Sequence, residues 1–156
     1  MAEAYLEVIS LIERLHRQFL EVVKLELEGL GIRDINNQAV MLFNIGDAEM
    51  SVGELTWRGC YLGSNVSYNV KKLVEAGYLA QERSVHDRRS IHVKLTVKGR
   101  ALRDRLSAMH ERQINLLKQT AITPADLEAA AITLRRLERF WMHGGRAEPS
   151  TPQFAA

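Results

Sequence analysis

Residues 51–97 constrain the fold most, because two short helix signals are followed directly by two strand signals. Ser51 can begin a helix, since its hydroxyl can accept a backbone N–H while Glu54, three residues on, completes a capping box. Gly59 and Gly63 follow and supply the backbone freedom that a tight turn between crossed helices needs. The pattern predicts a helix, a turn and a second helix.

The second helix is expected from Ser64 to Ala76, because its apolar residues recur on one face of a 3.6-residue period. These residues are Val66, Val70, Leu73 and Val74. Gly77 follows, where glycine often ends a helix. The opposite arc carries groups that can contact base edges or phosphates, namely Ser64, Asn65, Tyr68, Lys71, Lys72 and Glu75. An ordinary solvated helix face has the same pattern, so this arc alone does not indicate DNA binding.

A basic hairpin is predicted next, since residues 79–84 and 91–97 read as strands on either side of "VHDRRS". Asp87 lies two residues before Arg89 and can brace its guanidinium group, while Arg88 or Arg89 projects outward. A narrow minor groove attracts such an arginine. A hydrophilic hairpin tip without a ligand is the alternative interpretation of this tripeptide.

The segments "SVGEL", "SNVSYNVKKLVEAGYL" and "HDRRSIHVKLTVKGRAL", in that order, resemble the MarR family of bacterial transcriptional regulators. The resemblance includes the wing pattern Asp-x-Arg and a Leu-Thr-x-x-Gly sequence at residues 95–99. It implies a mainly α fold with a small β-hairpin wing, an α+β winged helix. It also implies a sequence-specific regulator of double-stranded DNA, usually a repressor.

Docking of such a fold would place the second helix in the major groove and the wing tip in the minor groove. We expect Ser64, Asn65 and Tyr68 to contact bases, and Lys71, Lys72 and Arg58 to contact phosphates. Asp87 would position an arginine without reading sequence. The candidate DNA-binding residues are Arg58, Ser64, Asn65, Ser67, Tyr68, Lys71, Lys72, Asp87, Arg88 and Arg89.

The charge distribution agrees with a DNA-binding role for the middle of the chain. Residues 58–105 carry eleven Lys or Arg against four Asp or Glu, whereas residues 1–57 carry four against ten. A local charge of +7 within a chain of net charge +2 is typical of a surface that neutralises phosphates.

The remaining residues predict helices. We expect helices at about 3–29, 37–45, 97–119 and 123–142, little strand character in "GDAEM", and a disordered tail over 144–156. Residues 1–143 would then form one domain, with the winged unit at about 35–97. An apolar stripe on the last helix exceeds what a small core can cover, so the terminal helices are expected to form a homodimer on a palindromic operator. Internal packing of both stripes is the alternative.

Ligand binding is expected only by resemblance, because relatives in the family bind small aromatic or anionic effectors. His16, Phe19 and Phe43 are candidate lining residues, although core aromatics and hydrogen-bonded histidines are commoner. Cys60 is the single cysteine, which excludes an intramolecular disulfide and favours a reducing compartment. Its default role is a buried thiol rather than an oxidant sensor.

Catalysis is not indicated. The five histidines lack metal-ligand spacing, no Gly-rich phosphate loop occurs, and Cys60 has no nearby partner for nucleophilic chemistry. No metal or other cofactor is therefore expected, and the absence of a signal pattern or a long apolar run predicts a cytoplasmic protein without membrane contact. A winged-helix module that binds protein or structured RNA is the alternative function, since the fold does not determine the ligand.

Overall fold

A computed structural model describes residues 1–59, 63–86 and 90–144, with only the backbone described for Gly63 and Ser64. Its contacts divide the chain into two compact units, Met1–Glu111 and Arg112–Ala156. The first unit holds the winged helix, and the second holds the last helix. The expected single domain over residues 1–143 stays a prediction. Cys60 and the tail from residue 145 onward lie outside the described residues.

Helix α1 (Ala2–Gly29) opens the first unit and ends at a glycine turn. Gly31 adopts a φ of 75°, which glycine reaches without a Cβ penalty. The Ile32 N–H donates to the Leu27 carbonyl at 2.9 Å, which closes a Schellman motif. The expected end of this helix in the glycine segment is confirmed.

The next segment corrects an expectation, because the single helix predicted over residues 37–45 is two short pieces. It forms an α-helix, α2 (Asn36–Ala39), and a 3₁₀ helix, η1 (Val40–Asn44). Ala39, Leu42 and Ile45 are all buried, and they are spaced by three residues. Met41 is buried as well, and a short 3₁₀ turn of this kind commonly extends the end of an α-helix.

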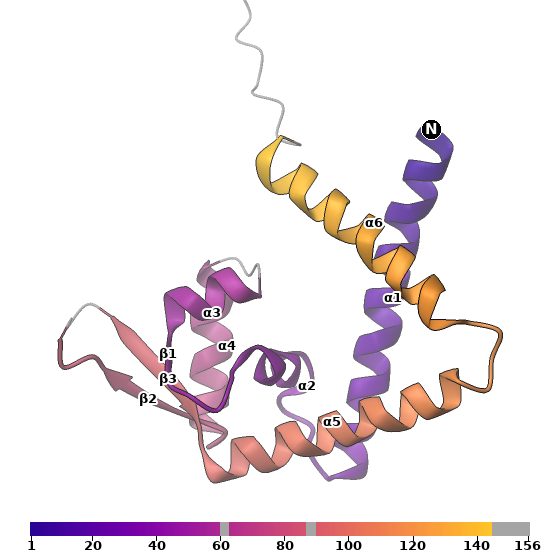
Figure 1. The fold of residues 1–156 in the computed structure, drawn as a ribbon. Helices are drawn as coiled ribbons and strands as arrows, with labels where there is room; N and C mark the ends of the chain where they lie inside the picture. The colour runs from indigo at the N-terminus through magenta and orange to yellow at the C-terminus, as the bar shows by residue number, and fades with distance from the viewer. Residues whose placement is uncertain (60–62, 87–89, 145–156) are drawn as a thin grey trace, which may run out of the picture. The chain divides into compact units, whose positions relative to one another are not determined.

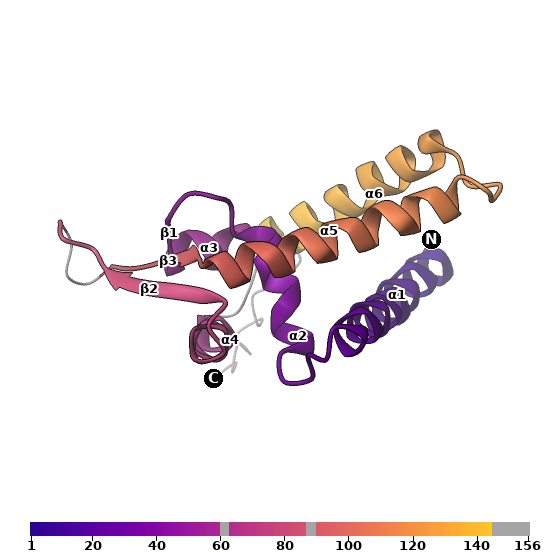
Figure 2. The same ribbon diagram turned by 90° about the horizontal axis from the view of Figure 1, so that it is seen from below.

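The sheet has three antiparallel strands in the order β1-β3-β2. The wing strands β2 (Leu79–Arg83) and β3 (Ile91–Leu95) pair from Leu79 opposite Leu95, and Figures 1 and 2 show them side by side. The expected hairpin is confirmed, with both strands slightly shorter than predicted.

Strand β1 (Met50–Ser51) corrects the expectation of little strand character in "GDAEM". Met50 pairs with Val93 and is buried against the sheet. A strand of two residues is too short to show alternation, and its pairing depends on the edge that β3 offers. Only the tertiary structure reveals it.

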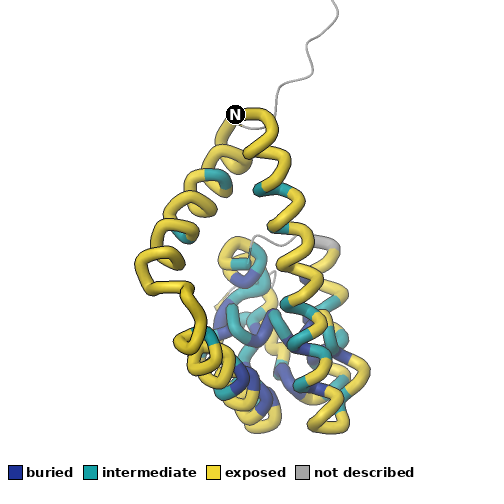
Figure 3. The backbone as a smooth tube through the Cα atoms, turned by 90° about the vertical axis from the view of Figure 1, so that its right-hand side faces the viewer, coloured by how far each residue is buried: buried dark blue, intermediate teal, exposed yellow. Residues whose placement is uncertain are grey.

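The helices of the winged unit are α3 (Val52–Arg58) and α4 (Gly63–Glu75), followed by the long α5 (Val97–Leu117). Their buried apolar side chains join those of α1, η1 and the sheet in one cluster. Figure 3 shows in dark blue that the buried positions gather around the winged unit. The core includes Val23, Leu27, Ile35, Leu42, Leu55, Val66, Leu73, Val93, Leu95, Leu102 and Leu106.

The second unit contains α6 (Pro124–His143). Thr123 caps it and forms a complete capping box with Asp126. No residue of α6 is buried. Across the described parts of the chain, no helix combines the length and apolar content that a bilayer crossing requires.

Candidate nucleic-acid interface

Helix α3 is held at its start by the capping box predicted from the sequence. The Ser51 hydroxyl accepts from the Glu54 N–H at 3.0 Å, and the Ser51 N–H donates to the Glu54 carboxylate at 2.7 Å. The backbone hydrogen bond, followed by that from the Ser51 hydroxyl, lowers the pKa of Glu54. The charged carboxylate therefore pairs with the Ser51 N–H, while the Ser51 hydroxyl satisfies one N–H of the first helical turn.

Helix α4 follows α3 and buries the face that the spacing predicted. Val66, Val70 and Leu73 are all buried, and each such side chain contributes about 1.5 to 3 kcal/mol through removal from water. On the same helix, the Asn69 side-chain oxygen accepts from the Gln38 amide of α2 at 3.1 Å. These contacts fix the rotation of α4, so the arc that faces outward is determined.

That outward arc carries the predicted candidates. Asn65, Ser67, Tyr68 and Lys71 are exposed, with Tyr68 at 58%. The Lys72 ammonium lies 5.3 Å from the centre of the Tyr68 ring, a distance at which a cation and an aromatic face attract. The structure thus brings an amide, a hydroxyl, a phenol and two cations together on one helix. Ser64 lies in the first turn of this helix, but its side chain lies outside the described residues.

The ion pair described on α4 is weak. The Lys71 ammonium lies 3.8 Å from the Glu75 carboxylate, and both side chains are mostly exposed. An exposed pair of this kind contributes little to stability, because water screens it. Lys71 can therefore exchange this carboxylate for a phosphate at little cost.

Arg58 ends α3 at the edge of the same region. Its guanidinium donates to the Asn44 carbonyl at 3.3 Å, which ties α3 to the end of η1. Sequence reasoning assigned Arg58 only to a phosphate contact, and it missed this bond within the protein. The guanidinium fork has more donors than the bond uses, so both roles are compatible.

The wing is held by pairs near its base. The Lys94 ammonium contacts the Glu82 carboxylate at 2.9 Å across β2 and β3, and this hydrogen bond raises the pKa of Lys94. His92 lies 2.9 Å from the Glu49 carboxylate beside β1. At the outer end, the Ser84 N–H donates to the Ser90 carbonyl at 3.0 Å. The predicted tip residues Asp87, Arg88 and Arg89 lie outside the described residues, and their roles stay predictions.

The start of α5 explains the Leu-Thr-x-x-Gly pattern. The Thr96 hydroxyl donates to the Gly77 carbonyl at 2.7 Å and accepts from the Gly99 N–H at 3.0 Å, so it caps α5. A Cβ at Gly99 would collide with the Tyr78 carbonyl oxygen. Only glycine therefore lets α5 pass this close to the chain that leaves α4.

The same junction closes the end of α4. Gly77 has a φ of 80°, and the Tyr78 N–H donates to the Leu73 carbonyl at 2.9 Å in a Schellman motif. The Lys98 ammonium donates to the Ala76 carbonyl at 2.7 Å. The sequence predicted that Gly77 ends the helix, but the bond from Lys98 was missed. The only local indication of it is that Lys98 directly precedes Gly99.

The predicted effector residues separate in the structure. Phe19 and Phe43 both contact His110, with ring centres at 5.8 Å and 4.9 Å. His16 is exposed on α1. Both phenylalanines are partly buried against the core, so they hold α1, η1 and α5 together. Their role in binding an effector stays a prediction. Sequence reasoning missed His110, which directly follows the buried Met109 of α5.

Another ion pair missed from the sequence fixes the loop before β1. The Arg103 guanidinium on α5 contacts the Asp47 carboxylate at 2.7 Å. The hydrogen bond to Asp47 raises the pKa of Arg103. Separation by more than fifty positions in the chain hides this pair from any local pattern. Within the described residues, no group of His, Cys, Asp and Glu side chains is arranged to hold a metal ion.

Comparison with known proteins relates this chain to DNA-binding transcriptional regulators. Residues 35–99 match a family model described as a winged helix DNA-binding domain. The chain is 39% identical over 143 residues to the exopolysaccharide II synthesis transcriptional activator ExpG of Rhizobium meliloti (strain 1021). This alignment covers 91% of the chain and 74% of that protein.

Solved structures share the fold at low sequence identity. A mutant of Escherichia coli MarR complexed with operator DNA matches with a TM-score of 0.71 and 18% identity, covering 86% of this chain and 95% of that one. Staphylococcus aureus MarR in complex with salicylate and kanamycin matches with a TM-score of 0.71 and 18% identity, covering 90% and 94%. The expected α+β winged helix is confirmed.

Proposed function

Because this chain belongs to the MarR family of winged-helix transcriptional regulators that bind DNA, we propose that it binds a palindromic duplex operator as a homodimer whose affinity a small ligand controls. The observation that carries the proposal is the outward arc of α4. It presents polar and cationic side chains on a helix whose other face is buried and whose C-terminal end is held by the start of α5.

In this proposal, α4 enters the major groove and presents Asn65 and Tyr68 to base edges, while Lys71 and Arg58 contact phosphates. The wing places Arg88 or Arg89 in the neighbouring minor groove. The structure of E. coli MarR with operator DNA supports this docking by fold similarity. The local positive charge of residues 58–105 supports it by electrostatics.

Selection of bound duplexes from a random pool tests sequence specificity and symmetry together. A symmetric enriched site with half-sites about one helical turn apart would support a dimer on a palindrome. No enrichment would contradict sequence-specific binding of duplex DNA.

Single substitutions then test the roles of individual residues. Arg89→Ala should weaken operator binding by about 1 to 3 kcal/mol if the side chain lies in the groove. Lys71→Ala should lower the salt dependence of binding by about one unit of slope, and Lys24→Ala on α1 serves as the matched control. An Arg89→Ala protein that binds as tightly as its parent would refute the wing assignment.

The homodimer is supported by the apolar residues that α6 leaves exposed, since exposed apolar surface of this kind marks interaction sites. Sedimentation measurements over a range of concentrations test it. A monomer at micromolar concentrations would contradict the proposed geometry, because one subunit supplies one recognition helix.

Control by a small ligand is supported by the S. aureus MarR structure with salicylate and kanamycin, and by fold similarity alone. The sign of regulation is a separate question. Repression was expected from the family resemblance, yet the relative ExpG is named a transcriptional activator. A reporter gene placed behind the selected operator decides between the two roles. A DNA-binding regulator acts where the chromosome is, and a cytoplasmic location is proposed accordingly.

The alternative of an RNA-binding or protein-binding module is tested by competition. Duplex DNA and structured RNA are compared at matched salt, because charge alone attracts both. Stronger binding to RNA would favour the alternative.

A further inference from the structure

Two adjacent lysines on the outward arc of α4 have different partners. The Lys71 ammonium lies 3.8 Å from the Glu75 carboxylate, whereas the Lys72 ammonium lies over the Tyr68 ring, 5.3 Å from its centre. No hydrogen bond or ion pair joins the Lys72 side chain to a described residue. Sequence reasoning treated both lysines as phosphate contacts, because nothing in the local pattern distinguishes them.

Helix geometry explains the contact between Lys72 and Tyr68. Residues four positions apart lie one turn apart on the same face of an α-helix. Side chains lean toward the N-terminus of the helix, so Lys72 reaches back over the Tyr68 ring. The face of an aromatic ring carries negative charge density, which attracts the ammonium. The contact therefore favours the ring orientation in which one face meets the cation.

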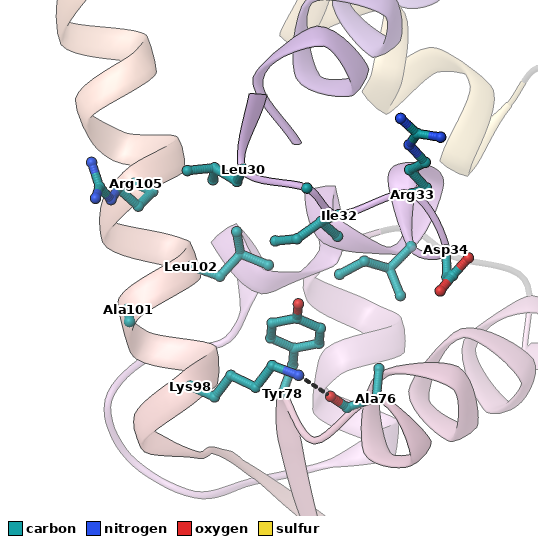
Figure 4. Close-up of a pocket in the computed structure, with 12 residues that line it drawn as sticks. Leu30, Ile32, Arg33, Asp34, Ala76, Tyr78, Lys98, Ala101, Leu102 and Arg105 are labelled. Atoms are coloured by element: carbon teal, nitrogen blue, oxygen red, sulfur yellow. Dashed lines mark hydrogen bonds between the residues drawn. The ribbon is translucent and has the colours of Figure 1, made fainter. Parts of the chain in front are cut away.

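The helix that carries both residues is itself held in place. The Asn69 side-chain oxygen, directly after Tyr68, accepts from the Gln38 amide of α2 at 3.1 Å. At the C-terminal end of α4, the Lys98 ammonium donates to the Ala76 carbonyl at 2.7 Å, as Figure 4 shows. These bonds fix the rotation of α4 and its end. The direction of the Tyr68 side chain then depends mainly on its own torsion angles, which the cation over the ring limits.

We propose that Lys72 is a positioning residue for Tyr68, and that Tyr68 determines the preference at one base pair of each operator half-site. This inference rests on the proposed function. A phenol held in one orientation before binding loses less side-chain entropy when it meets a base edge. A tyrosine free to rotate would accept several base edges, since its hydroxyl both donates and accepts hydrogen bonds. Lys72 thus contributes to selectivity through the ring, whereas Lys71 contributes to affinity through a phosphate.

Selection of duplexes from a random pool, repeated with three variants, tests this role. Tyr68→Leu should lose the preference at one base pair of each half-site, which identifies the position that the tyrosine contacts. Lys72→Gln should weaken the preference at that same base pair about threefold, because an exposed contact between a cation and a ring is weak. Lys71→Gln, the matched control, should weaken binding almost equally for all sequences. A weakened preference at a different base pair, or at none, in Lys72→Gln would overturn the proposal.

A double-mutant cycle on operator affinity separates positioning from a direct phosphate contact. Lys72→Gln should weaken binding about threefold in the parent protein, and it should lose most of that effect once Tyr68→Leu has removed the ring. Lys71→Gln should weaken binding by the same factor with or without the ring, and it should lower the salt slope by about one. Lys72→Arg should keep the parental preference, since a guanidinium also stacks on an aromatic face. Additive effects of Lys72→Gln and Tyr68→Leu would overturn the positioning role.

NMR of the free protein tests the contact without DNA. Protons held over the face of an aromatic ring resonate upfield, so the Cε protons of Lys72 should lie upfield of those of Lys71. Tyr68→Leu should remove this difference, and equal shifts in the parent protein would overturn the proposal. If the difference is present and no duplex is enriched, the DNA-binding function fails while the contact stands. If a duplex is enriched and the cycle is additive, the positioning role alone fails.

Discussion

Helices α4 and α6 are both amphipathic, yet they differ in how far their apolar faces are buried. Helix α4 buries Val66, Val70 and Leu73 completely or almost so. In α6, Leu127 and Leu134 stay 49% and 44% exposed. The difference teaches that periodicity identifies the apolar face of a helix but does not identify what covers it.

The reason lies in the neighbours of each helix. Helix α4 contacts α2, α3 and β2, so its apolar face has partners within the same unit. Leu127 and Leu134 of α6 are instead exposed, and exposed apolar surface costs about 25 cal/mol per square ångström relative to burial. The proposed dimer would cover this face. Substitutions on both helices test that difference.

The largest effect is expected at Leu73 on the covered helix. Leu73→Ala should lower the free energy of unfolding by about 2 to 5 kcal/mol, because it leaves a cavity in a closed core. Denaturant unfolding measures it, and the loss should not depend on protein concentration. A loss below about 1 kcal/mol would mean that α4 is less firmly packed than its burial indicates.

The next effect tests how α4 is joined to α5. Gly99→Ala should lower the free energy of unfolding by about 1 to 3 kcal/mol, since the added methyl group meets the Tyr78 carbonyl. Gly53→Ala on α3 is the matched control, where the added Cβ would meet only the Ser51 side chain at an ordinary 3.7 Å. Denaturant unfolding measures the change for both variants. Equal stability of the two variants would refute the steric argument.

On the uncovered helix, Leu134→Ala should weaken self-association instead of folding. Truncation of an interface leucine is expected to cost about 1 to 2 kcal/mol of the dimerisation free energy. Sedimentation equilibrium measures this change. If Leu134→Ala instead lowers unfolding stability at every concentration, as Leu73→Ala should, then α6 packs within its own chain and the comparison fails.

The smallest effect concerns the capping boxes, since both α3 and α6 begin with one. Hydrogen bonds from the backbone and side chain of Ser51 lower the pKa of Glu54 below 4.5, and the Thr123 side chain and backbone lower that of Asp126 below 3.8. A carboxyl group with a lowered pKa in the folded state stabilises the protein above its unfolded pKa. That contribution is lost as the pH falls through the folded pKa.

Stability should therefore decline as the pH falls below about 4.5, by similar amounts for the two caps. Glu54→Gln and Asp126→Asn should each remove part of this dependence. Carboxyl titration followed by NMR checks the two groups directly. If the pKa of Asp126 has its ordinary value while the pKa of Glu54 is lowered, the two capping boxes differ and the prediction fails.

Local signals predicted much of the fold. Ser51 with Glu54, Thr123 with Asp126, and Gly77 each act within a few residues, so their roles could be inferred from the sequence. The buried face of α4 was predictable for the same reason, and so was the set of polar residues opposite it. The family resemblance added the docking geometry, which no local pattern carries.

Features that depend on distant residues were missed. Strand β1 forms because β3 offers it an edge, and Arg103 meets Asp47 across more than fifty positions. The 3₁₀ helix η1 continues directly from the four-residue helix α2, which the helical interpretation of residues 37–45 did not anticipate.

The junction of Gly77, Thr96 and Gly99 has a consequence for how such a protein can change its target. The hydrogen bonds of Thr96 and the close contact at Gly99 join the end of α4 and the base of the wing to the start of α5. Helix α4 and the base of the wing must therefore turn together as one rigid body. New DNA-binding preferences would then arise by substitution of exposed side chains, while the angle between α4 and the wing stays constant.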